Sequence, residues 1–162
     1  MFSVGLLDTF ALAGFGALVI WAALSDIRDL IIPNRIVGAI LLLYPVHASV
    51  SDVPVNWPAD VLVGAVVFFI GAFLFRMKFV GGGDVKLLAA VTIWAGSGLA
   101  LPMILVTVLA GGVLAVIAVG NNVWVNRGTG LLTLSSLRKE RLPYGAAVGF
   151  GGLFTIVQLL AV

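Results

Sequence analysis

The chain has 162 residues, of which 62% are hydrophobic, and 9 basic and 7 acidic side chains give it a formal net charge of +2. Its mean hydropathy of +1.22 excludes a soluble domain, which has too little interior to bury so much apolar surface. The apolar runs are continuous rather than alternating, so we expect an all-α protein integral to a membrane. The absence of cysteine excludes disulfides, thiolate nucleophiles and cysteine zinc sites, and the single His47 cannot hold a metal ion alone.

The apolar segments predict about six membrane-spanning helices, because about 20 apolar residues cross the hydrocarbon core. Gly96 to Gly98 and Pro102 predict a turn between the fourth and fifth segments, and Pro33 suits the first turn of the second. The six segments are approximately Val4 to Leu24, Pro33 to Val50, Ala59 to Met77, Asp84 to Ala95, Leu101 to Gly120 and Tyr144 to Val162.

The basic residues predict the orientation of these segments. All nine fall on one side of the predicted topology, and the positive-inside rule makes that side cytoplasmic, with both termini outside. Trp57 and Trp94 are expected near the outer boundary of the membrane, and Trp21 and Trp124 near the inner one. No basic residue precedes the first apolar run, which therefore resembles a retained span rather than a signal peptide.

The same topology divides the acidic residues into two groups. Asp8, Asp52 and Asp60 are expected near the outer surface, in contact with water, and Glu140 falls within a basic surface cluster. The other three, Asp26, Asp29 and Asp84, are expected at the inner face. A charged side chain near the hydrocarbon zone is costly, so these three are the candidates for function.

Asp84 directly follows three glycines in the run Gly81-Gly82-Gly83-Asp84-Val85-Lys86. Glycines permit unusual dihedral angles and the close approach of a substrate backbone, and the free N–H groups of a following helix could orient the carboxylate. This short motif alone equally fits a glycine-rich turn in which Asp84 caps a helix.

Asp26 lies seven residues before Pro33, in the run Asp26-Ile27-Arg28-Asp29-Leu30-Ile31-Ile32-Pro33-Asn34. The run also fits a polar turn at the lipid headgroups. Asp26 and Asp29 could form a pair on one helix face, but such neighbours leave little room for a peptide bond between them. Asp26 with Asp84 is the better pair for peptide hydrolysis.

Hydrolysis by two carboxyl groups requires one to take a proton from water and the other to donate one to the carbonyl oxygen. Mutual repulsion prevents both groups from ionising together, so the pair titrates as a unit. This chemistry requires no metal, cofactor or covalent intermediate.

These residues together resemble the type IV prepilin peptidases, which are bacterial membrane aspartic proteases. The resemblance is carried by Gly81-Gly82-Gly83-Asp84, by Asp26 seven residues before the Pro of Ile32-Pro33-Asn34, and by Pro143-Tyr144-Gly145 at the last predicted span. The stretches 81–87 and 143–147 are especially similar to the short form that serves tight-adherence (Flp) pili.

The resemblance implies that Asp26 and Asp84 are the catalytic pair, with Asp29 outside the motif. The supporting or substrate-binding candidates are Gly81, Gly82, Gly83, Lys86, Pro33 and Asn34, although Lys86 equally suits a lipid headgroup. It implies a single membrane-embedded domain over residues 1–162, without the cysteine-bearing methylase domain of the longer members. The implied substrates are prepilins and pseudopilins, whose basic leader is cut at the cytoplasmic face of the bacterial inner membrane. The implied surroundings are lipid and other pilus assembly proteins, without nucleic acid.

Other interpretations stay open from the sequence. A small proton-coupled transporter also carries acidic groups in its spans, and a noncatalytic subunit of a pilus machine would have similar hydropathy. An archaeal preflagellin-type peptidase is a near relative. Presenilin-like proteases share the Gly-x-Gly-Asp pattern, but they have a Tyr-Asp pair within a span where this chain has Ser25-Asp26.

Overall fold

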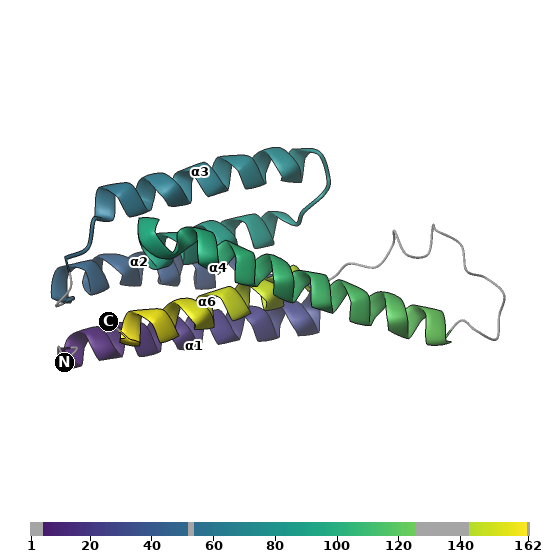
Figure 1. Cartoon of the computed structure of the whole chain (residues 1–162), viewed down its shortest axis with the longest axis horizontal. Coiled ribbons are helices and arrows are strands. Elements are labelled where there is room, and N and C mark those ends of the chain that lie inside the picture. Colours follow the sequence, from purple (N-terminus) through teal and green to yellow (C-terminus); the bar gives the residue numbers. More distant parts are fainter. Residues whose placement is uncertain (1–4, 52–53, 126–142, 162) are drawn as a thin grey trace.

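The protein is a bundle of helices in the computed structural model, which describes residues 5–51, 54–125 and 143–161 (Figure 1). The predicted all-α class is confirmed. The helices in these ranges are α1 (Leu6–Asp29), α2 (Asn34–Val50), α3 (Trp57–Arg76), α4 (Gly82–Val125) and α6 (Tyr144–Ala161).

The predicted fourth and fifth segments both belong to α4, which is broken at Gly96. Gly96 has φ +68° and ψ 175°, a conformation that favours glycine, and the chain reverses there. Asp60, at the start of α3, accepts a hydrogen bond from Ser97 N–H at 2.8 Å. Gly71, near the end of α3, lies against Val85, while Gly111 lies against Tyr144 at the start of α6. The two parts of α4 therefore run in opposite directions, as the predicted turn requires.

Four of the described helices, α1, α3, α4 and α6, are long and apolar enough to cross a membrane. With its 17 residues, α2 is shorter. The predicted six separate helices therefore become five within the described ranges, because the two parts of α4 are joined at Gly96. Six crossings and the sides of the termini stay predictions.

The core is built around Trp94, which is 2% exposed. Its ring stacks on Phe15 of α1 at a centroid distance of 4.2 Å and on His47 of α2 at 5.1 Å. Its Nε1–H donates to the carbonyl oxygen of Ile40 at 3.0 Å. Trp94 does not face the membrane surface, because its indole finds both stacking and hydrogen-bond partners inside the bundle, and its position near the outer boundary stays a prediction. Trp21 and Trp57 are exposed, as an aromatic belt at the membrane surface requires.

A second correction concerns Asp8 and Asp60, which are 4% and 6% exposed rather than in contact with water. Asp8 Oδ1 is hydrogen-bonded to His47 Nδ1, and Asp60 Oδ2 accepts from the Tyr44 hydroxyl at 2.9 Å. Buried polar groups require such partners. Asp52 and Glu140 lie outside the described residues.

Small residues allow the helices to approach closely at several crossings. A Cβ added at Gly71 would lie 2.7 Å from Val85 Cγ1 across α3 and α4, and one at Gly152 would lie 2.8 Å from Val19 Cγ1 across α1 and α6. Close packing at small residues is a principal source of helix association in membranes. The end of α1 and the beginnings of α4 and α6 lie at the same end of the bundle.

Candidate active site

Asp26 lies in the last turn of α1, where the chain changes direction. Leu30 caps this helix in the left-handed conformation, and its N–H donates to the Asp26 carbonyl oxygen. The Ser25 hydroxyl donates to the carbonyl oxygen of Ile31 at 2.8 Å and holds the following segment against the helix end. The Asp26 side chain is 5% exposed, and its Oδ2 accepts a hydrogen bond from Gly145 N–H of α6 at 2.6 Å. Helix α6 therefore determines where this carboxylate lies.

Asp84 lies in the first turn of α4, where negative charge is favourable. A Cβ added at Gly81 would lie 2.5 Å from Asp84 Oδ2, and one at Gly83 would lie 3.3 Å from Ile32 Cβ. Close approach explains these glycines, because neighbouring side chains occupy the space. The expected unusual dihedral angles are absent from the glycines of this run, none of which has a positive φ.

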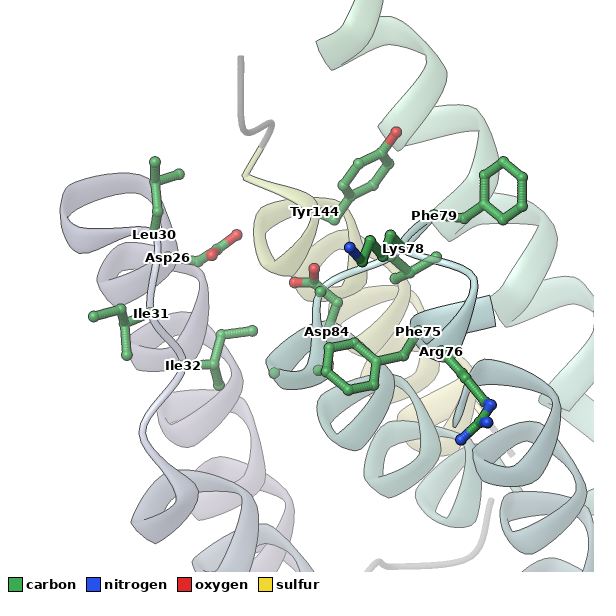
Figure 2. A pocket seen from close by; sticks show the side chains of 14 residues that line it. Asp26, Leu30, Ile31, Ile32, Phe75, Arg76, Lys78, Phe79, Asp84 and Tyr144 are labelled. Atoms are coloured by element: carbon green, nitrogen blue, oxygen red, sulfur yellow. The ribbon is translucent and has the colours of Figure 1, made fainter. Parts of the chain in front are cut away.

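Asp26 and Asp84 line one cavity of about 940 Å³ at this end of the bundle. The two carboxylates come from helices on opposite sides of the cavity (Figure 2). Asp29, three residues after Asp26, is exposed and is not among the described residues that line the cavity. The structure therefore brings together the two acids that the sequence pairs.

Two loops complete the cavity wall. Leu30 to Ile32 follow Asp26, and the segment from Phe75 to Gly83 joins α3 to α4. Lys78, which adopts a left-handed φ of 62°, and Arg76 are the basic residues among those that line the cavity, and the Arg76 guanidinium points away from the two acids (Figure 2). A wall with both apolar and charged parts can hold a peptide segment that carries both kinds of side chain.

The remaining predicted site residues lie beside the cavity. Pro33 caps the beginning of α2 rather than entering its first turn. Asn34, the first residue of α2, accepts a hydrogen bond through Oδ1 from Lys86 Nζ at 3.1 Å. This contact ties α2 to the turn of α4 that carries Asp84. It gives Lys86 a partner inside the protein, where the sequence suggested substrate or a lipid headgroup.

The sequence interpretation did not name Gly145 as a site residue. The sequence feature that could have identified it is Pro143-Tyr144-Gly145, one of the three motifs that carry the resemblance to the prepilin peptidases. No spacing rule connects this motif to Asp26, which lies 119 residues earlier.

The fold and the cavity define a polytopic helical membrane protein in which two acidic side chains face one space at one end of the bundle. The sequence model of the type IV leader peptidase family matches residues 13–116, a range that contains both acids. The chain belongs to this family, as the sequence motifs predict.

Two curated relatives extend this comparison. The chain is 28% identical over 149 residues to a prepilin leader peptidase/N-methyltransferase of Bacillus subtilis (strain 168), with 91% of this chain and 55% of the relative covered. It is 40% identical over 76 residues to the prepilin peptidase EppA of Methanothermobacter thermautotrophicus, with 44% of this chain and 20% of the relative covered. The matched parts span about half and about a fifth of these relatives. No solved structure matches the chain.

Proposed function

We propose that the protein is an aspartic endopeptidase that removes the leader peptide from prepilins. The observation that carries this proposal is the cavity that Asp26 and Asp84 line together. Family membership supports the same conclusion, and both relatives are named prepilin peptidases. Neither relative suggests a transporter or a noncatalytic subunit.

The proposed reaction uses the two carboxyl groups as a proton-sharing pair. One carboxylate takes a proton from a water molecule, whose oxygen attacks the carbonyl carbon of the scissile peptide bond. The other carboxyl donates its proton to the carbonyl oxygen. The tetrahedral intermediate then collapses, the C–N bond breaks and the leaving nitrogen takes up a proton. Holding the peptide between two fixed acids supplies much of the rate through orientation alone.

The position of the cavity suggests how a prepilin would bind. The site lies at the end of the bundle that also carries Arg28, Arg35, Arg76, Lys78 and Lys86, the end expected at the cytoplasmic face of the inner membrane. The apolar helix of the substrate would lie in the lipid alongside the spans, and its leader would enter the cavity. The similarity of residues 81–87 to the Flp-type peptidases favours Flp-like pilins as substrates.

The direct test is cleavage of a prepilin-like peptide by the purified full chain in detergent. We expect a single cut after the glycine that ends a basic leader, identified from the product masses. The matched controls are a peptide with a scrambled leader and the enzyme with both Asp26→Asn and Asp84→Asn. Failure of the folded protein to cut Flp-like and other prepilins would reject the proposal, as would equal cleavage by the double variant.

The contact between Lys86 and Asn34 gives a second, smaller prediction. Both side chains are exposed, so their hydrogen bond stabilises the observed position of the Asp84 turn by at most about 1 kcal/mol. We expect Lys86→Met and Asn34→Ala each to lower kcat/KM about two- to fivefold, in line with that energy. The double variant should lose no more than either single one, because the two changes remove one contact. Independent losses that multiply would show that Lys86 and Asn34 act separately.

A further inference from the structure

The beginning of α6 contacts Asp26 through one backbone N–H group. Gly145 is the second residue of α6, where backbone N–H groups have no partner within the helix. Its N–H donates to Asp26 Oδ2 at 2.6 Å. The next N–H along the helix, that of Ala146, donates to Pro143 O at 3.2 Å. The Gly145 amide thus lies beside the cavity that Asp26 and Asp84 line together.

The space around this amide accepts only glycine without adjustment. A Cβ at position 145 would lie 2.8 Å from Asp26 Oδ2, 2.9 Å from Asp26 Cβ and 2.8 Å from Ile32 Cδ1. Carbon atoms do not approach this closely without displacing a neighbour. Ile32 is 8% exposed and packs between Gly145 and Gly83, so it has little room to move. The Asp26 side chain would have to give way.

Resting on the proposed function, we propose that Gly145 is a positioning residue of the peptidase reaction, whose backbone N–H fixes the Asp26 carboxylate in register with Asp84. The hydrogen bond to Oδ2 prevents free rotation of the carboxylate. It also links the geometry of the acid pair to the docking of α6 on α1. The absence of a Cβ is what permits this short contact.

The kinetic test compares Gly145→Ala with Gly149→Ala. The control residue lies one turn further along α6 on the same interface, where an added Cβ would meet Ala23 Cβ of α1 at 3.0 Å. A displacement of about 1 Å at a reacting group costs about 10²-fold in rate. We expect Gly145→Ala to lower kcat by about that factor with an unchanged KM, because the amide donates to Asp26 and the proposal gives it no contact with substrate. Gly149→Ala should retain the wild-type kcat. Equal losses in both variants, or a loss expressed only in KM, would overturn the proposal.

A second test does not depend on catalysis. In the wild-type protein labelled with ¹⁵N-glycine, the Gly145 amide should shift in the NMR spectrum as the acid pair titrates, because its hydrogen bond ends on a carboxylate. The resonance is assigned by its loss in Gly145→Ala. Asp26→Asn should remove most of this pH-dependent shift, because only Asp84 is then left to titrate in the cavity, and the Gly149 amide should show none. A Gly145 amide whose chemical shift does not change with pH, or changes equally in Asp26→Asn, would overturn the proposal.

The two tests separate this proposal from the proposed function. If no prepilin is cut but the Gly145 amide follows Asp26, the peptidase assignment fails while the contact with Asp26 stands. If prepilins are cut but the amide ignores Asp26, the peptidase assignment stands and the role of Gly145 fails.

Discussion

Asp26→Asn and Asp84→Asn are each expected to lower prepilin cleavage by about 10⁴-fold, the upper range of what general acid–base catalysis contributes. Each substitution preserves the shape of the side chain and removes one of the two groups that must exchange a proton. Since the acids act as one unit, the double variant should be no slower than either single variant. Initial rates of product formation, measured by mass analysis at equal protein concentration, check this.

Asp29→Asn is the matched control, because Asp29 lies on the same helix end, is exposed and does not line the cavity. It should keep most of the wild-type rate. Thermal unfolding in detergent should be similar for all the single variants, which separates loss of chemistry from loss of fold. An inactive Asp29→Asn beside an active Asp26→Asn would show that the wrong aspartate of α1 was chosen. Full activity in Asp84→Asn would reject the pairing altogether.

The meeting of Asp26 with Asp84 could be predicted because membrane topology restricts where a polar group can lie. Two acidic side chains at helix ends on the same side of the membrane are both confined to the region near that membrane surface. The glycines before Asp84 also indicated that other groups approach this carboxylate closely. The break at Gly96 was equally predictable, since two glycines and a serine in succession interrupt a long apolar run.

The inward faces of the helices could not be predicted in the same way. In water, the buried face of a helix is its apolar face, but lipid is as apolar as leucine, so hydropathy does not separate inside from outside. Phe15 is fully buried while Phe69 is 71% exposed, although both lie in apolar helices. Hydropathy therefore does not reveal that the Trp94 ring points into the bundle, or that its partners lie on α1 and α2.

The buried positions of Asp8 and Asp60 escaped prediction for a related reason. A carboxyl near a helix end usually reaches water, unless a partner from another helix lies beside it. The partners here are His47, which is 39 residues from Asp8, and Tyr44, which is 16 residues from Asp60. The sequence around either aspartate does not predict these contacts, because they depend on how α1, α2 and α3 pack.

His47→Ala is expected to lower the free energy of unfolding by about 3 kcal/mol or more, the second large effect that the structure predicts. Asp8 and His47 are 4% and 5% exposed, so the substitution leaves the Asp8 carboxyl buried without its partner. It also removes the ring that stacks on Trp94. Thermal and denaturant unfolding in a fixed detergent, followed by near-UV circular dichroism, measures the loss.

The pair of substitutions Asp8→Leu and His47→Leu distinguishes an unpaired buried group from simple loss of packing. Replacing both partners of a buried polar contact by apolar residues is often nearly neutral, so the double variant should be more stable than His47→Ala. Asp8 lies 18 residues before Asp26, about 27 Å along α1, so kcat should be retained in the folded double variant. A double variant as unstable as His47→Ala would mean that packing around Trp94, rather than the contact between Asp8 and His47, holds this end of the bundle together.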